Sequence, residues 1–334
     1  MISVSFIIPT LNAGRVLGKC LASIKKQRTK YHYEIIIIDG GSDDKTLKIA
    51  KKNQAKIISN HLKTAEAGKA AGVKIARGKY LAFIDSDNIL PSPNWLNQML
   101  QPFSEKEIIG SEPIKFTYRK NAGLIERYSA LIGANDPYAL ITGVYDRFSY
   151  LTQKWTGLNL STTDKRKYLK IKLEKNKLLP TIGANGTIFR RQLFQNFRSD
   201  YLFDIDFLTS QLKHRHYLYF AKVKTGIIHT YCENSIKKFI RKQNRRVVDY
   251  FTYRRQRHFN WDQTNKWGTI KFVFYTLTLL PMIYHLILGY SRQPDRAWFF
   301  HPLACLITLY CYTINYLRYQ LGLIKPLNRN QWRQ

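Results

Sequence analysis

Strand and helix patterns alternate through residues 1–100, and the apolar strand patterns end in polar side chains. The strand patterns are VSFIIPT (Val4 to Thr10), EIIIIDGGSDD (Glu34 to Asp44), KIIS (Lys56 to Ser59) and KYLAFIDSDN (Lys79 to Asn88). Helical patterns separate them, the first over Leu17 to Lys26. Buried strands that alternate with helices predict βαβ units and an α/β fold with a mostly parallel sheet.

Three polar clusters follow these strands, and ligands of parallel sheets bind at the carboxyl ends of the strands. The clusters are Thr10 with Asn12, Asp39 with Asp43, and Asp85 with Asp87. Carboxylates are the ligands that hard divalent cations prefer, and one or two are enough for magnesium. The residues alone leave other interpretations open, because Asp85 and Asp87 could cap a helix and Thr10 and Asn12 could form a turn. Asp43 and Asp44 are expected to cap a helix.

The charge of the chain favours anionic partners. Lys and Arg outnumber Asp and Glu by 54 to 22, which gives a net charge of +32. Nucleic acid, anionic lipid and phosphorylated substrates are all candidates for such a chain. There is no zinc finger or RNP-type motif, and the densest basic run, Lys237 to Arg257, precedes two apolar stretches. We therefore expect an anionic membrane surface and no nucleic acid as partner, with a nucleic-acid-binding protein as the weaker alternative.

The C-terminal part has the pattern of a membrane-associated tail. Apolar residues recur at helical spacing from Ser235 to Tyr253, with basic residues on the other face, as in interfacial helices. The apolar stretches Phe272 to Tyr290 and Trp298 to Leu317 are each near the length that spans a bilayer. We predict a membrane-embedded hairpin or re-entrant pair, although ordinary buried helices would also fit.

The first hundred residues carry a family resemblance. SFIIPTLNAGRVLGKCLASI, YEIIIIDGGSDDKT and GKAAGVKIARGKYLAFIDSDN resemble, in order and spacing, the nucleotide-binding half of glycosyltransferase family 2, whose members are inverting enzymes with the GT-A fold. GANGTIFRR, FDIDF and IIHT extend the similarity to about residue 245. The expected parts are a nucleotide-sugar-binding half (1–100), an acceptor-binding half of the same domain (101–234), a basic interfacial segment (235–267) and an apolar helical tail (268–334).

The resemblance implies roles for the donor site. It places Pro9, Thr10 and Asn12 in the base pocket, Asp39 at the base or ribose, Lys69 near the donor, Asp85 at the ribose or the metal, Asp87 on the metal, and His229 as a further metal ligand. The implied cofactor is Mn²⁺ or Mg²⁺. A lone histidine is also commonly structural, so that alternative stays open for His229.

In the acceptor half, the resemblance implies that Asp204 is the general base. The family pattern is an acidic pair followed by an acid two residues on; here Phe203 replaces the first acid, and Asp206 is the alternative base. Both aspartates could instead stabilise a helix N-terminus. The loop Gly183 to Gly186 would admit the donor sugar and acceptor, with Asn185 and Gly186 at the donor.

RKQNRR (Arg241 to Arg246) loosely resembles the Gln-and-Arg motif with which membrane-bound synthases of the family hold the diphosphate, but it lacks their tryptophan. Gln243, Arg245 and Arg246 are therefore candidate diphosphate ligands, because arginine forks match phosphate geometry. The competing interpretation is that this basic face meets lipid headgroups.

These features together predict an inverting, metal-dependent, hexosyltransferase-like enzyme. It would move a sugar from a nucleoside-diphosphate sugar to a lipid-linked acceptor or a cell-surface glycan precursor. Basic residues flank the apolar tail on both sides, which places the catalytic domain at the cytoplasmic face of the membrane. The alternative is a non-catalytic, membrane-bound scaffold that retains the fold.

Overall fold

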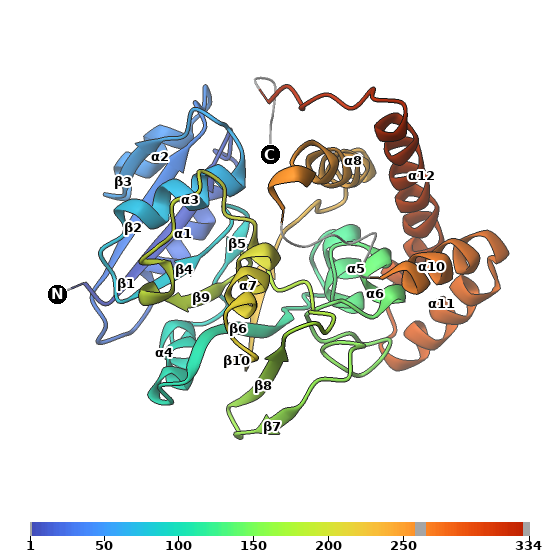
Figure 1. Ribbon diagram of the computed structural model, residues 1–334, viewed down its shortest axis with the longest axis horizontal. Helices are drawn as coiled ribbons and strands as arrows, with labels where there is room; N and C mark the ends of the chain where they lie inside the picture. The colour runs from blue at the N-terminus through green and yellow to red at the C-terminus, as the bar shows by residue number, and fades with distance from the viewer. Residues whose placement is uncertain (1, 258–264, 330–334) are drawn as a thin grey trace.

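The computed structural model describes residues 2–257 and 265–329. Within these residues the chain builds one mixed, ten-stranded sheet in the order β3-β2-β1-β4-β9-β6-β10-β8-β7, with β5 paired to β10 (Figure 1). The strands are β1 (Val4–Thr10), β2 (Tyr33–Asp39), β3 (Lys56–Ser59), β4 (Tyr80–Phe83), β5 (Asn88–Ile89), β6 (Ile108–Phe116), β7 (Thr162–Asp164), β8 (Tyr168–Glu174), β9 (Thr187–Arg190) and β10 (Tyr217–His229). The predicted α/β class is confirmed.

The N-terminal half of the sheet is parallel, as its alternating pattern predicts. β1 pairs with β2 and β4, β2 pairs with β3, and all seven residues of β1 are buried. The helices that connect these strands are α1 (Leu17–Lys25), α2 (Thr46–Lys52) and α3 (Ala65–Ile75). Thr64 caps α3 by accepting a hydrogen bond from the amide of Ala67 at 3.1 Å.

The middle of the chain supplies strands that the sequence pattern did not predict. The sequence patterns predicted no strand in residues 101–179, but β6 lies inside the sheet between β9 and β10, and β7 and β8 extend it. The apolar run of β6 is broken by Gly110, Glu112 and Pro113, which weakens its strand pattern. Glu112 is nevertheless fully buried, because cations from distant segments pair with it.

The chain after β5 adds further helices. They are α4 (Trp95–Leu100), α5 (Leu124–Ile132), α6 (Pro137–Thr142), α7 (Asp204–Lys213) and the amphipathic α8 (Ile236–Thr252), with short 3₁₀ turns η1 (Gln101–Ser104), η2 (Arg191–Phe194) and η3 (Arg254–Gln256). Of these, α4 and α5 contact β6, while α6 and α8 contact the C-terminal helices. Ser235 caps α8 through the amide of Lys238. The predicted basic amphipathic helix is therefore present.

The two apolar stretches of the tail differ in shape. The first is two helices, α10 (Lys266–Thr278) and α11 (Leu280–Arg292), which meet at 88° around Leu279. It is therefore not one continuous helix, and Pro281 in the first turn of α11 lies close to this bend. The second stretch lies in α12 (His301–Gln320), which with η4 (Arg296–Phe300) forms the one described helix long and apolar enough to cross a membrane.

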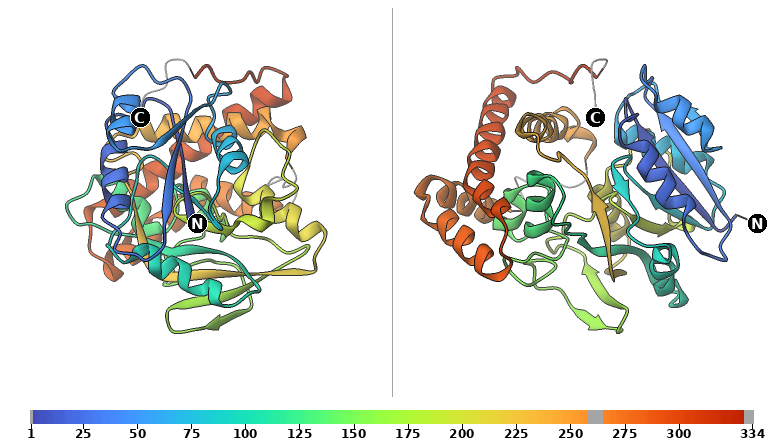
Figure 2. Two further views of the ribbon diagram at one scale, coloured as in Figure 1. Left: turned by 90° about the vertical axis from the view of Figure 1, so that its left-hand side faces the viewer. Right: turned by 180° about the vertical axis from the view of Figure 1, so that it is seen from behind.

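The tail packs against the sheet domain on one side and exposes apolar side chains on the other. Trp298 and Phe300 are buried, and the Phe300 ring lies 5.2 Å from that of Tyr128 in α5. Asp295 accepts a hydrogen bond from Arg127 at 3.0 Å. Figures 1 and 2 show α10, α11 and α12 on the side of the molecule opposite β1, β2 and β3. Residues 258–264 and 330–334 of the predicted interfacial and tail segments lie outside the described residues.

Candidate active site

A cavity of about 840 Å³ lies between the sheet edge, α8 and the C-terminal helices. Of the predicted site residues, those that line it are Pro9, Lys69, Asp85, Asp87, Asn185, Asp204, His229, Arg245 and Arg246. Thr10, Asn12, Asp39, Gly186 and Gln243 are not among its described lining residues. The structure therefore brings the predicted metal ligands and the predicted base together, while part of the predicted base pocket lies outside this cavity.

The turn after β4 places Asp87 beside His229. The backbone carbonyl of Asp87 accepts a hydrogen bond from the Thr230 amide at 3.1 Å, and Asn88 pairs with His229 across β5 and β10. As a result, His229 Nε2 lies 3.5 Å from Asp87 Oδ1. The Nδ1 atom of His229 is buried and has no hydrogen-bond partner among the described residues. Two segments that are far apart in sequence thus contribute to one polar cluster.

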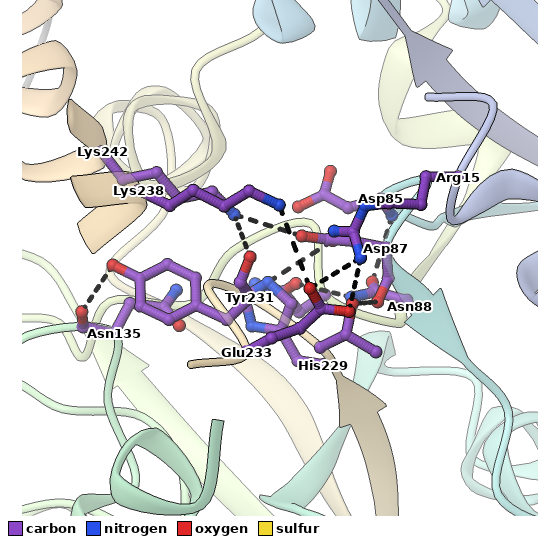
Figure 3. A network of polar contacts seen from close by, with 12 residues as sticks. Arg15, Asp85, Asp87, Asn88, Asn135, His229, Tyr231, Glu233, Lys238 and Lys242 are labelled. Carbon is purple, nitrogen blue, oxygen red and sulfur yellow. Dashed lines mark hydrogen bonds and ion pairs between the residues drawn. The ribbon is translucent and has the colours of Figure 1, made fainter. Parts of the chain in front are cut away.

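Lys242 of α8 completes this cluster. It was not among the site residues predicted from the sequence. Its Nζ lies 3.2 Å from Asp87 Oδ2, donates to the Tyr231 carbonyl at 3.0 Å, and stands 4.5 Å from the centre of the Tyr231 ring. Figure 3 shows Lys242 and His229 both directed at Asp87. The spacing of Lys242, Arg245 and Arg246 on one helical face was the available signal.

The two carboxylates of the turn have opposite pKa shifts. Burial raises the pKa of Asp87, but the cation of Lys242 and then His229 outweigh it, so the pKa falls below its ordinary value. Burial and then the negative charge of Asp87 raise the pKa of Asp85. Lys242 therefore offsets the charge of one carboxylate, and the pair still offers oxygen atoms to a cation in the cavity.

Asp204 and Lys69 form an ion pair in the same cavity. Lys69 Nζ, from α3, lies 2.7 and 2.8 Å from the two carboxylate oxygens of Asp204 in the first turn of α7. Burial raises the pKa of Asp204, and Lys69 opposes that rise. Asp206 is placed differently: it pairs with Arg257 at 2.7 Å and lines a separate cavity. Only Asp204 of the two candidate bases lines the cavity that holds Asp85 and Asp87.

Thr10, Asn12 and Asp39 build the turns beside the cavity. Asp39 accepts hydrogen bonds from the hydroxyl of Thr10 at 2.9 Å and from the amides of Gly41 and Ser42 at 2.9 and 2.7 Å. The side-chain oxygen of Asn12 accepts a hydrogen bond from the amide of Asp43 at 3.0 Å. These contacts agree with the turn interpretation, and a further contact with a nucleoside stays a prediction.

Asp44 accepts hydrogen bonds from the amides of Gly14 and Thr46 at 2.8 and 2.9 Å, at the start of α2. Asp43 and Asp44 were expected to cap a helix; the N-cap residue of α2 is Lys45, and Asp44, one residue before it, accepts a hydrogen bond from the amide of Thr46 in the first turn.

The loop from Gly183 to Gly186 is held by a buried ion network. Asn185 accepts a hydrogen bond from Asn88 through its side chain at 3.0 Å and one from Arg147 through its carbonyl at 3.0 Å. Arg147 and Lys222 both lie 2.5 Å from a carboxylate oxygen of Glu112. A buried charge is tolerated only when it is paired in this way. The network therefore fixes the position of Asn185 at the cavity.

Gly186 has a backbone reason to be glycine. Its φ is +83°, and a Cβ would come within 2.8 Å of Ile227 and 3.1 Å of Trp95. The residue lets the loop turn tightly before β9, and its amide donates to the Phe83 carbonyl at 3.1 Å. Gly186 therefore forms the tight turn between Asn185 and β9.

On α8, only part of the predicted diphosphate motif faces the cavity. Gln243 is fully buried and donates to the carbonyl of Asn135 and to the hydroxyl of Tyr231 at 3.2 and 3.3 Å. Arg246 pairs with Asp136, and both line the cavity. The cations that α8 directs to the cavity are Lys242, Arg245 and Arg246.

A GT-A-like fold is also found in a solved structure with nearly the same extent. The mannosyltransferase PcManGT from Pyrobaculum calidifontis, in complex with GDP-Man and Mn²⁺, matches with a TM-score of 0.51 at 11% identity, over 94% of this chain and 86% of that chain. At this identity the likeness shows the fold. The predicted fold, an α/β GT-A type with a largely parallel sheet and C-terminal helices, is confirmed.

The chain belongs to glycosyltransferase family 2. The family described as "Glycosyl transferase family 2" matches residues 5–198. Glycosyltransferase AglE of Haloferax volcanii is 30% identical over 136 residues, which cover 38% of this chain and 44% of that protein. A PGL/p-HBAD biosynthesis glycosyltransferase of Mycobacterium tuberculosis is 37% identical over 109 residues, 31% of this chain and 42% of that protein. The chain therefore matches less than half the length of these relatives.

The stability of the folded protein should depend on pH through Asp146. It is buried beside Arg147 and Glu112, and burial together with Glu112 raises its pKa to about 6, against the pull of Arg147. Between its ordinary pKa of about 3.9 and about 6, the folded state binds a proton that the unfolded state has lost. The bound proton therefore stabilises the folded state at low pH, and this stabilisation is lost as the pH rises through about 6.

Asp146→Asn should remove this dependence. Relative to the variant, the wild type should lose free energy of unfolding as the pH rises from about 4 to about 6, by on the order of 3 kcal/mol at most. Urea denaturation followed by circular dichroism at several pH values measures the difference. Asp200→Asn, at an exposed ion pair with Lys74, is the control. A difference that stays constant with pH would show that Asp146 is ionised throughout.

Proposed function

We propose that this protein is an inverting glycosyltransferase that moves a hexose-type sugar from a nucleoside-diphosphate sugar to an acceptor hydroxyl. The observation that carries the proposal is the convergence of Asp85, Asp87, His229 and Asp204 on one cavity beside the sheet. The solved mannosyltransferase with GDP-Man and Mn²⁺ supports this class of donor. In this proposal residues 1–100 bind the donor and residues 101–234 the acceptor.

The residues present fit a divalent cation. Asp85 and Asp87 offer carboxylate oxygens, and the unpartnered Nδ1 of buried His229 is a further donor atom. No group of three His, Cys, Asp or Glu side chains within 2–257 and 265–329 forms a complete site, so the diphosphate and water would supply the remaining ligands. A bound Mn²⁺ or Mg²⁺ would stabilise the charge of the departing nucleoside diphosphate.

Asp204 is the proposed general base. In an inverting transfer the acceptor oxygen bonds to the anomeric carbon, the bond from that carbon to the diphosphate oxygen breaks, and the hydroxyl proton passes to the base. The raised pKa of Asp204 makes its carboxylate a better proton acceptor, while the Lys69 ammonium favours the ionised form. Lys242, which contacts Asp87, is the proposed ligand of the anionic leaving group beside the metal.

The tail is proposed to attach the enzyme to the cytoplasmic face of a membrane. Side chains on α10 and α11 expose a broad apolar surface, which includes Trp267, Phe274, Leu277, Leu280 and Tyr284. Surfaces of this kind mark protein or membrane contacts. The acceptor would then be a lipid-linked sugar or a glycan precursor that is assembled at the membrane.

Asp87→Asn should abolish metal-dependent donor binding. Thermal denaturation of the purified protein is followed with a panel of nucleotide-sugars and nucleoside diphosphates, with and without Mn²⁺. A ligand at about a hundred times its Kd adds about 2.7 kcal/mol of stability. The wild type and the control Asp200→Asn should show a metal-dependent shift, and Asp87→Asn should show none. A shift that persists in Asp87→Asn would remove Asp87 from the metal site.

Asp204→Asn should keep donor binding and lose transfer. General base catalysis contributes roughly 10²–10⁴-fold, so the transfer rate should fall within that range while the thermal shift with donor remains. Asp206→Asn, two residues along the same helix, is the matched control and should retain transfer. If Asp206→Asn loses transfer and Asp204→Asn does not, then the base is Asp206.

Phe274→Glu with Leu280→Glu should weaken membrane binding, because two charges would have to enter the apolar part of the bilayer. Flotation with vesicles of anionic phospholipid measures the bound fraction. Leu62→Glu with Tyr217→Glu, at two exposed apolar residues of the sheet domain, is the matched control. Equal flotation of both double variants would contradict attachment through the tail.

A further inference from the structure

The cavity continues beyond the carboxylates into an apolar branch between four helices. We use "apolar branch" for the part lined by Tyr138 and Ala139 of α6, Val247 and Phe251 of α8, Ile270, Phe272 and Val273 of α10, and Leu309, Tyr312 and Tyr316 of α12. The other end of the same cavity is lined by Asp85, Asp87 and Asp204. One continuous cavity therefore joins the proposed catalytic carboxylates to a hydrocarbon-like environment.

Cations from α8 line the cavity between these two parts. Lys242, Arg245 and Arg246 lie three and four residues apart on one helical face, and no acidic residue of α8 is among the described lining residues. Lys242 and Arg246 contact Asp87 and Asp136 across the cavity. Guanidinium and ammonium groups at the edge of an apolar pocket complement a phosphate that is joined to a hydrocarbon chain.

The apolar branch opens onto the exposed apolar surface of the tail. Ile270 and Tyr316 line the cavity and yet are 57% and 45% exposed, so the opening lies at α10 and α12. Next to Ile270 along the exposed side of α10 are Trp267 and Phe274, which are 82% and 61% exposed. The exposed apolar surface of α10 therefore adjoins residues that line the cavity, with Lys266, Thr269 and Thr313 as polar lining residues beside them.

We propose that the apolar branch binds the hydrocarbon chain of a phosphate-linked lipid acceptor, with its phosphate at Arg245 and Arg246. This inference rests on the proposed function and names the acceptor class. A general base at Asp204 requires an acceptor that presents a hydroxyl, so the lipid carries a hydroxyl-bearing group, such as a sugar, beyond its phosphate. Its hydroxyl oxygen bonds to the donor's anomeric carbon, its proton goes to Asp204, and the bond to the nucleoside diphosphate breaks.

Photo-crosslinking tests the branch without any donor or metal. The probe is a long-chain polyprenyl phosphate that carries a diazirine near the end of its chain, added to the purified protein in mild detergent. Cross-linked peptides should come from α10 and α12. Unlabelled polyprenyl phosphate should compete for the site, whereas polyprenol of the same length and inorganic phosphate should each compete much less, because each supplies only one of the two contacts.

Thr313→Trp places a large side chain at an exposed position of α12 that lines the cavity. Loss of contact with about two methylene groups corresponds to roughly tenfold weaker binding, so cross-linking should fall by about that factor. Ile270→Trp on α10 should act in the same way, as a second variant. Thr278→Trp, at an exposed threonine outside the lining residues, is the matched control and should cross-link like the wild type.

Three results would overturn the proposal: equal cross-linking in Thr313→Trp and Ile270→Trp, full competition by polyprenol, or full competition by inorganic phosphate. The last two would indicate a purely hydrocarbon surface and a free-phosphate site, respectively. The outcome is independent of the donor assay. If polyprenyl phosphate binds as expected but no nucleotide binds, the proposed transfer fails while the lipid site stands; the reverse result removes only the lipid site.

Discussion

The buried pairing of Glu112 with Lys222 and Arg147 is the interaction on which the rest of the site depends. Glu112 lies in β6, Lys222 in β10, and Arg147 also donates to the carbonyl of Asn185. Leaving one of these charges without its partner would cost several kcal/mol, because water does not reach them. The network therefore holds two inner strands and the loop before β9 in one arrangement.

The electrostatic balance of the cavity follows from that arrangement. β10, fixed by the network, ends at His229 and thereby holds the turn that carries Asp87. The carboxylates that cluster in the cavity would repel one another without nearby cations. These cations come from other elements: Lys242 from α8 and Lys69 from α3. Such paired groups could exchange partners with the proposed donor and its cation, because each charge is already desolvated and oriented.

The C-terminal helices are part of the cavity as well as a surface feature. α10 and α12 line it, and α10 and α11 also expose apolar side chains. Burial of Trp298 among side chains that include Tyr128 of α5 fixes these helices relative to the proposed catalytic carboxylates. A family 2 glycosyltransferase built in this way has its proposed donor site and its apolar surface connected through one cavity.

The sequence by itself determined the parallel half of the sheet, because β1 and β3 are short apolar runs whose strand signal is local. The family resemblance in the sequence also selected Asp87 and Asp204. Tertiary structure decided the rest. The sequence did not predict β6, because the charged Glu112 interrupts its apolar pattern. The cations that pair with Glu112 come from distant segments. Lys242 was missed because α8 carries several basic residues between Lys237 and Arg246, and only packing decides which of them face the carboxylates.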